Sequence, residues 1–401
     1  MLAGIAEGPS RLENYSTGAD CASTLGCMRS LGVTWERKDG VIEVQGRGSV
    51  LSAAAGPLDC GNSGSTMRML SGIVAGQKFT SEMIGDESLS RRPMARVIDP
   101  LSAMGAQIVS QGGTPPLLIA GTDLKAIEYK VPVASAQVKS CLLFAGLLAQ
   151  GETRIEESVR TRDHGEVALR AFGAQVERKR VGGGNEIRIR GGQRLRGIET
   201  RIPGDLSSAA FFMCAVALFP GSHLIIPNLL MNPTRARLLD VLMQMGLRVS
   251  VTQLQEIHGE MIGSLQVDGA RLKGGTIAGG DSAALIDEIP VLAAIAPYTE
   301  QGIEVRDAKE LRVKESDRIA AVATNLRLMG AEVEEREDGL KIPGGQSLNG
   351  VELDSFGDHR IAMAFAVAGL RASGETLIRG AESAAISYPA FFQMLEEVVE
   401  R

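Results

Sequence analysis

The chain has 401 residues and a formal net charge of −6, from 42 basic and 48 acidic side chains. This charge argues against nonspecific binding to nucleic acids or anionic membranes, although it does not exclude a local basic pocket. Only 4% of the residues are aromatic, so we do not expect a surface that stacks bases. The length predicts two or three domains.

Cysteine content and hydropathy indicate where the protein works. The five cysteines form no CxxC pair, and their odd number among apolar neighbours favours reduced thiols in the core. No uncharged apolar run reaches the roughly 18 residues of a membrane span, and the first residues lack the basic region of a signal peptide. We therefore expect a cytoplasmic protein without a membrane segment.

One pattern repeats six times along the chain and reads as helix, strand, helix and further strands. Each first helix ends at a glycine, and these glycines are 68 to 81 residues apart: Gly8, Gly76, Gly151, Gly221, Gly302 and Gly374. A glycine commonly follows the last apolar turn of a helix, because it adopts the left-handed conformation without strain. The regular spacing predicts six α/β units.

The first helix of each unit is apolar on nearly all sides, as in residues 209–221 (AAFFMCAVALFPG), and such helices are buried. The second helices are amphipathic, so we predict helices inside and sheets around them. The opening MLAGIAEG lacks the polar start of the other first helices. We therefore expect the chain to begin within a helix and part of the sixth unit to be missing; the alternative is one degenerate repeat.

Polar residues open the other first helices, and helix N-termini bind anions through free N–H groups and a partial positive charge. Basic residues gather in the same places or in the partner turns, which predicts a site for a substrate with several negative charges. The alternative is that these side chains only cap and bridge helices. The set comprises Arg68, Arg91, Arg92, Lys139, Arg162, Arg312, Lys314, Arg318 and Arg360.

Three such segments lie in the first half of the chain. Residues 61–68 (GNSGSTMR) offer glycines that let backbone amides approach an anion, but no Gly-Lys-Ser/Thr of a Walker A motif follows. Residues 135–140 (SAQVKS) bring a hydroxyl, a carboxamide and an ammonium to a helix start. Residues 161–166 (TRDHGE) include Asp163, a candidate cap for the next helix. Ordinary capping remains the alternative for each segment.

Three further segments lie in the second half. Residues 287–290 (DEIP) place carboxylates before an apolar helix, as a cap or a general base. In residues 311–318 (LRVKESDR), an acid and two cations fall within about one helical turn, with Lys314 and Arg318 on one face. That arrangement suits proton transfer beside a bound phosphate or carboxylate, the alternative being a solvated salt bridge. Residues 356–360 (FGDHR) repeat the theme.

Several chemistries lack their motifs. The four histidines form no HExxH or close His/Cys set, so a catalytic zinc is not expected. No GxSxG is present, and no GxGxxG follows a strand, so a nucleophilic serine of that type and a dinucleotide cofactor are not supported. We expect neither a cofactor nor a metal.

Taken in order, these segments resemble the 5-enolpyruvylshikimate-3-phosphate synthase family over essentially the whole chain. KESDR and DHR in this order are highly specific for that family. The related UDP-N-acetylglucosamine enolpyruvyl transferases share the fold but lack the set, and they carry a Cys where residues 87–94 read ESLSRRPM. The matching segments also include SRRP (90–93), PGDLSSAAFF (203–212) and SYPAFF (387–392).

The resemblance implies two lobes, each an inside-out barrel of three α/β units, with boundaries at residues 1–203 and 204–401. Lobe one would hold a truncated first helix, and lobe two would lack its N-terminal strand. The implied reaction joins phosphoenolpyruvate to the 5-hydroxyl of shikimate 3-phosphate and releases phosphate through a tetrahedral intermediate, in aromatic amino-acid biosynthesis. These small molecules would be the partners of a monomer that binds neither nucleic acid nor membranes.

The resemblance also implies residue roles. Asp287 would take the proton of the 5-hydroxyl, while Lys314 and Glu315 would orient that hydroxyl and move the proton at the methylene carbon. The implied shikimate 3-phosphate contacts are Ser135, Ala136, Gln137, Arg162, Asp287 and Lys314. The implied phosphoenolpyruvate contacts are Gly64, Arg92, Gln137, Arg318 and Arg360.

Two departures from the family pattern bear on activity. The family begins with a segment that supplies a Lys, a Ser and an Arg to the site, which this sequence lacks, so we expect very little activity from the 401 residues. The alternatives are a non-catalytic remnant that binds shikimate 3-phosphate weakly, or a nucleotide-sugar transferase. Residues 385–389 also lack a Lys that some members carry, which marks a subclass. Gly64 predicts glyphosate sensitivity in a longer form.

Overall fold

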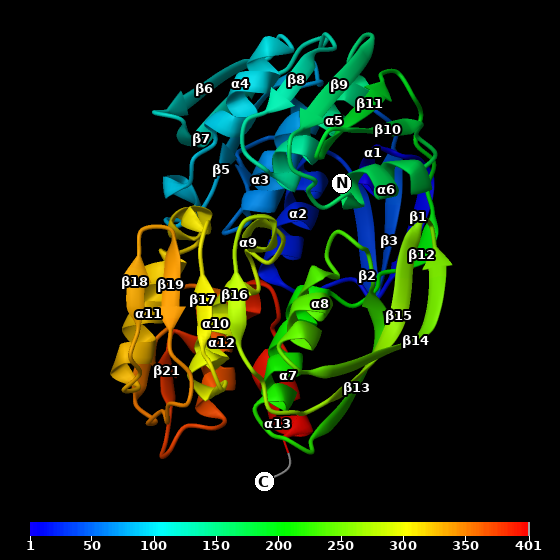
Figure 1. The fold of residues 1–401 in the computed structure, drawn as a ribbon. Coiled ribbons are helices and arrows are strands. Elements are labelled where there is room, and N and C mark those ends of the chain that lie inside the picture. The colour runs from blue at the N-terminus through cyan, green and yellow to red at the C-terminus, as the bar shows by residue number, and fades with distance from the viewer. Residues whose placement is uncertain (400–401) are drawn as a thin grey trace. The chain divides into compact units, whose positions relative to one another are not determined.

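The computed structural model describes residues 1–399 and divides the chain into two compact units, Met1–Ile202 and Pro203–Arg401. Each unit contains three sheets and the helices that they surround (Figure 1).

The first unit contains three four-stranded sheets. The first has the order β12-β1-β3-β2, with β1 (Glu7–Glu13), β2 (Thr34–Lys38), β3 (Val41–Arg47) and β12 (Glu199–Arg201). The second has the order β4-β5-β7-β6, with β4 (Leu58–Asp59), β5 (Thr80–Ile84), β6 (Gln107–Gln111) and β7 (Thr114–Ala120). The third has the order β10-β11-β9-β8, with β8 (Glu128–Val131), β9 (Glu152–Glu157), β10 (Val176–Val181) and β11 (Gly184–Arg190).

The second unit also contains three sheets. They have the orders β13-β15-β14, β16-β17-β19-β18 and β20-β21. Their strands are β13 (His223–Leu230), β14 (Arg248–Ile257), β15 (Glu260–Asp268), β16 (Gly275–Ile277), β17 (Ile303–Val305), β18 (Glu334–Arg336), β19 (Gly339–Ile342), β20 (Glu352–Asp354) and β21 (Leu377–Arg379).

Strand pairing repeats in four of the six sheets. In all four four-stranded sheets a parallel pair is followed by two antiparallel neighbours: β12 and β1, β4 and β5, β8 and β9, and β16 and β17 are the parallel pairs. The expected helix end at Gly8 is wrong, because α1 (Leu2–Ile5) ends earlier and Gly8 lies in β1. There it pairs with Gly46 of β3.

Most helices follow the predicted division into buried and amphipathic kinds. The apolar helices are α3 (Gly64–Val74), α5 (Ala136–Leu148), α7 (Leu206–Ala217), α10 (Ile289–Ile295) and α12 (His359–Gly369). The others are α2 (Ala19–Ser30), α4 (Ala95–Ala103), α6 (His164–Ala171), α8 (Arg237–Gln244), α9 (Gly280–Ala284), α11 (Arg318–Leu328) and α13 (Phe391–Val398). The exceptions to the division are α2, which buries only Cys27 and Met28, and α11, which is buried over most of its length. Short 3-10 turns span Leu89–Arg91, Ala296–Tyr298, Lys309–Val313 and Ala381–Ile386.

The apolar helices form the core of each unit. Every residue of α7 except Ser208 is buried, and α7, α10 and α12 pack on one another in the second unit (Figure 1). In the first unit α3 and α5 approach so closely that a Cβ at Gly72 would lie 2.2 Å from the Cys141 carbonyl oxygen. Only glycine fits there. The first helices make the core of each unit. Polar residues at the N-termini of these helices therefore lie near one another within each unit.

Candidate active site

Two polar segments of the first unit lie at the starts of its buried helices. Ser63 caps α3 and Ser135 caps α5, each accepting a hydrogen bond at Oγ from the amide three residues later, at 3.2 and 3.4 Å. Gly64 and Ala136 are the first helical residues. Serine caps satisfy one of the free amides and leave others of the first turn unpaired within the helix. Both helix starts therefore suit an anion.

Gly64, Arg92 and Gln137 of the predicted site lie together beside Arg68. Arg68 Nη1 donates to Gln137 Oε1 at 2.8 Å, and Gln137 Nε2 donates to Ser65 Oγ at 2.7 Å. A Cβ at Gly64 would lie 2.9 Å from Arg68 Nη1 and 3.2 Å from Arg92 Nη1. Two guanidinium groups thus lie against the first turn of α3, where they add positive charge to the helix terminus.

Arg162 lies in residues 158–163, a segment without regular secondary structure between β9 and α6. The predicted capping role of Asp163 is wrong, because its side chain makes no capping hydrogen bond to α6. Its carboxylate instead accepts hydrogen bonds from Arg178 at 2.6 Å and Arg160 at 3.1 Å. Charge-assisted bonds of this kind are stronger than a bond to a neutral amide, so the arginines take the carboxylate.

Lys139 does not join the anion site that the sequence suggested. Its side chain is 1% exposed, and its ammonium lies 3.1 Å from Glu157 and 2.9 Å from Glu166, which are buried as well. Burial is the main cause that raises the pKa of Glu166, although the ammonium opposes this shift. The apolar residues that follow Lys139 were the signal that its side chain points into the core.

In the second unit, three cations surround Asp287, directly before α10. Its Oδ1 lies 3.5 Å from Arg318 Nη1 and 3.9 Å from both Lys314 Nζ and Arg360 Nε. Arg360 Nη1 also donates to the backbone oxygen of Asp287 at 2.9 Å. The fold thus brings together four predicted residues that are up to 73 positions apart. A carboxylate in this setting can accept a proton while the cations hold a nearby anion.

Arg318 connects three carboxylates. It is 1% exposed, its Nε donates to Asp358 Oδ2 at 2.8 Å, and its Nη2 donates to Glu315 Oε2 at 2.6 Å. Burial opposes the charge of this guanidinium, yet Asp358, Glu315 and Asp287 raise its pKa. Burial likewise opposes the charge of Asp358, but Arg318 holds the pKa of Asp358 below its ordinary value. Arg318 and Asp358 are therefore both charged at neutral pH.

The prediction that Lys314 and Arg318 share a helix face is wrong. Helix α11 begins only at Arg318, because Asp317 caps it by accepting a hydrogen bond from the Ala320 amide at 3.0 Å. Lys314 lies before this cap in extended backbone, after a 3-10 turn. It approaches Asp287 from that extended segment, so the two cations reach the carboxylate from different backbone geometries.

The start of α12 supplies the third cation. Asp358 caps this helix by accepting a hydrogen bond from the Arg360 amide at 2.9 Å. His359 is 6% exposed, and burial together with the Arg360 charge lowers the pKa of His359 to about 4. The imidazole is therefore neutral at pH 7. Arg360 is more accessible than Arg318, with a side chain that is 15% exposed against 1%, and Lys314 is 30% exposed.

A family model described as EPSP synthase (3-phosphoshikimate 1-carboxyvinyltransferase) matches residues 1–395. The chain belongs to this family. It is 60% identical over 402 residues to the 3-phosphoshikimate 1-carboxyvinyltransferase of Koribacter versatilis, and 54% identical over 402 residues to that of Solibacter usitatus. Both comparisons cover 100% of this chain and 93% of the relative.

Solved structures of EPSP synthase from Acinetobacter baumannii have the same fold. One is 42% identical with a TM-score of 0.86 and covers 99% of this chain and 92% of its own. Another is 40% identical with a TM-score of 0.85 and covers 100% and 93%. The relatives' names favour shikimate-pathway chemistry over the nucleotide-sugar alternative that the sequence left open.

Arg235, a cation of the second unit in this EPSP synthase family member, is not among the residues that the sequence predicted. Arg235 donates hydrogen bonds to Asp205 at 2.7 Å and to Ser207, and Ser207 donates in turn to Glu288. Glu288 follows Asp287 directly, so this network ties the start of α7 to the start of α10. The signal was a polar turn before an amphipathic helix, as at the segments that carry Arg162 and Lys314.

Two other cations of the predicted set pair with neighbouring carboxylates. Arg312 Nη1 donates to Asp317 at 2.8 Å and to Glu335 at 3.1 Å, which braces the cap of α11. Arg91 is exposed and pairs with Glu87 on the same turn.

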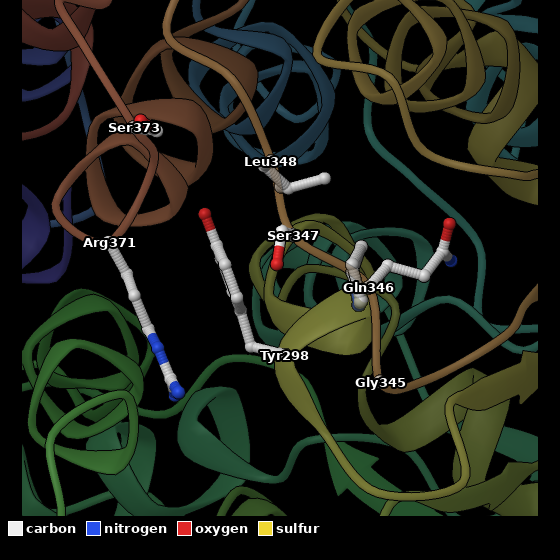
Figure 2. A pocket seen from close by; sticks show the side chains of 8 residues that line it. Tyr298, Gly345, Gln346, Ser347, Leu348, Arg371 and Ser373 are labelled. Atoms are coloured by element: carbon white, nitrogen blue, oxygen red, sulfur yellow. The ribbon is translucent and has the colours of Figure 1, made fainter.

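A cavity of about 370 Å³ in the second unit contains none of the predicted site residues. Figure 2 shows Arg371 and Tyr298 on its wall, with the guanidinium carbon 5.4 Å from the tyrosine ring centre. Within residues 1–399 no group of three or more His, Cys, Asp or Glu side chains is placed to hold a metal ion. In that same range no helix is long and apolar enough to cross a membrane.

Proposed function

We propose that this chain transfers the enolpyruvyl group of phosphoenolpyruvate to the 5-hydroxyl of shikimate 3-phosphate and releases phosphate. The cluster of one carboxylate and three cations at the start of α10 carries the proposal. Both substrates are anions, and the reaction needs a base beside them. A carboxylate that shares its surroundings with three fixed cations meets both requirements.

We assign the residues of the second unit to the chemical steps. Asp287 removes the proton of the 5-hydroxyl as its oxygen bonds to C2 of phosphoenolpyruvate, and Glu315 with Lys314 delivers a proton to C3. A C3 proton then returns to the same pair as the C2–O bond to phosphate breaks, and the enol ether and free phosphate result. Arg360 holds phosphoenolpyruvate, together with Arg318 through Nη1, whose bond to Asp287 at 3.5 Å is the longest that this guanidinium makes.

We assign the residues of the first unit to binding. Ser135, Ala136, Gln137 and Arg162 hold shikimate 3-phosphate, for which the capped start of α5 supplies backbone amides and the Ser135 hydroxyl as donors. Gly64, Arg92 and Gln137 hold phosphoenolpyruvate. The bare Gly64 leaves room beside two guanidinium groups, as the Cβ distances of 2.9 and 3.2 Å indicate. Lobe boundaries at residues 1–203 and 204–401, a monomeric state and a cytoplasmic location complete the proposal.

The test is phosphate release from the two substrates together. The purified chain is incubated with phosphoenolpyruvate and shikimate 3-phosphate, and the enol ether is identified by NMR. Shikimate without its 3-phosphate serves as the control acceptor, because it lacks the group that we assign to Arg162 and the start of α5. Phosphate release that is independent of the acceptor, or equal with both acceptors, would refute the assignment.

A further inference from the structure

Beneath the residues assigned to shikimate 3-phosphate lies a buried ionic cluster that the catalytic scheme does not use. Lys139 Nζ of α5 contacts Glu157 at the end of β9 (3.1 Å) and Glu166 of α6 (2.9 Å), with side-chain exposures of 1%, 3% and 1%. Burying three charged groups is costly, and apolar side chains of the same volume would often be at least as stable. Stability alone therefore does not account for the cluster.

Glu157 accepts hydrogen bonds from the loop that carries Arg162. Its Oε2 accepts from Lys139 at 3.1 Å, from the Thr161 amide at 3.1 Å and from Thr161 Oγ1 at 2.7 Å. Its Oε1 accepts from Asn185 Nδ2 at 2.7 Å, which fixes the carboxylate from the neighbouring strand β11. The carboxylate is thus held by four donor groups from three residues and cannot turn away from the loop.

Arg162 is consequently flanked by two anchored residues. Thr161 is bound to Glu157 on one side, and Asp163 is bound to Arg178 at 2.6 Å on the other. Residues 158–163 have no strand or helix to place them, so these side-chain bonds set the position of the loop. The same ammonium belongs to α5, whose first turn carries Ser135 and Gln137, so one buried cluster connects both proposed phosphate-binding segments.

We propose that Lys139 and Glu157 are positioning residues that act through Thr161. They keep Arg162 close to the start of α5, so that both can bind shikimate 3-phosphate. This inference rests on the proposed function. Thr161 is the residue of this cluster that can be substituted, because its hydroxyl can be removed without leaving a buried charge unpaired. Removing Lys139 would strand two buried carboxylates and endanger folding.

The test compares Thr161→Val with Thr161→Ser and with Thr153→Val. Thr153 lies on β9, is fully buried, and its Oγ1 has no hydrogen-bond partner among the described residues. Thr153→Val therefore makes the same chemical change but leaves the hydrogen bonds among Lys139, Glu157 and Thr161 intact. Dissociation constants for shikimate 3-phosphate are measured by calorimetry on the whole chain, and KM for phosphoenolpyruvate and kcat are measured at saturating shikimate 3-phosphate.

We expect Thr161→Val to weaken shikimate 3-phosphate binding about tenfold, as for a lost hydrogen bond to a charged group, with KM for phosphoenolpyruvate nearly unchanged. Thr161→Ser and Thr153→Val should bind like the parent. Equal weakening by Thr161→Val and Thr153→Val, failure of Thr161→Ser to rescue, or an equal loss for both substrates would overturn the inference. A parent chain that binds no shikimate 3-phosphate would refute the proposed function itself, and the inference with it.

Discussion

Replacing Arg318 by methionine tests whether this buried guanidinium neutralises the carboxylates around it. The side chain is 1% exposed and lies 2.8 Å from Asp358, 2.6 Å from Glu315 and 3.5 Å from Asp287. Methionine fills similar volume without charge. The carboxylate of Asp358, which is fully buried, then loses its counterion.

Removing one partner of a buried ion pair costs roughly 3–5 kcal/mol of unfolding free energy. In a unit of this size each kcal/mol shifts Tm by about 2–4 °C, so the expected loss is about 6–20 °C. Arg336→Met is the matched control, because Arg336 also pairs with two carboxylates, Glu304 and Glu334, but is 30% exposed. An exposed pair of this kind contributes about 0–1 kcal/mol.

The pH dependence separates lost charge pairing from lost packing. In the parent, Arg318 lowers the pKa of Asp358, so this stabilisation is present above the unfolded pKa and is lost as pH falls through the folded value. In Arg318→Met, burial without the guanidinium raises the pKa of Asp358 above its unfolded value. Protonation then stabilises the folded variant as pH falls. The difference in unfolding free energy between parent and variant should therefore become smaller as the pH falls from 7 to 4.5.

Circular dichroism in urea follows both units, whereas fluorescence of Trp35, the single tryptophan, reports only on the first. The predicted loss should appear in circular dichroism and leave the Trp35 transition in place if the units unfold separately. A loss as small as that of Arg336→Met would show that Arg318 is not required for stability. A gap between parent and Arg318→Met that stays constant with pH would show that packing accounts for the loss.

Three further predictions concern single side chains. Gly64→Ala should raise KM for phosphoenolpyruvate about tenfold, because the new Cβ lies 2.9 Å from Arg68 Nη1; steady-state kinetics measure this change. Asp287→Asn should lower kcat by about 10²–10⁴-fold in a phosphate-release assay, as expected for loss of a general base, while shikimate 3-phosphate still binds. His359→Gln should reduce the loss of stability on acidification: with a folded pKa of about 4, the parent loses about 2 kcal/mol between pH 7 and pH 5, because only the unfolded imidazole gains a proton. Urea titrations at both pH values measure this difference.

Each of these predictions has a control or an opposing result. Gly56→Ala adds a Cβ that meets nothing within 4 Å, and it should leave KM for phosphoenolpyruvate unchanged. Asp123→Asn removes an exposed carboxylate of the first unit and should retain full kcat. Equal acid sensitivity of the parent and His359→Gln would mean that His359 does not lose its proton affinity on folding.

The repeat was predictable because it depends on residues that are close together in the sequence. Glycines at regular intervals mark the repeat, although Gly8 lies in a strand, and the all-round apolar character of the first helices requires their burial. The pattern therefore determined six α/β units with helices inside. It also placed Ser135 and Asp358 at helix starts, since such residues satisfy free amides there.

Which cations are available to a ligand was decided by tertiary structure. Lys139 and Gln137 stand two positions apart in the same polar segment, yet Lys139 is buried against Glu157 and Glu166 while Gln137 pairs with Arg68. The partners come from distant parts of the chain, so local pattern carries no record of them. The same holds for Asp287, whose three cations lie on segments that meet only when α10, α11 and α12 pack together. The sequence alone identified the charged groups. Only the packing determined which counterion each one has, because pairing depends on distances in the folded chain that the order of residues does not give.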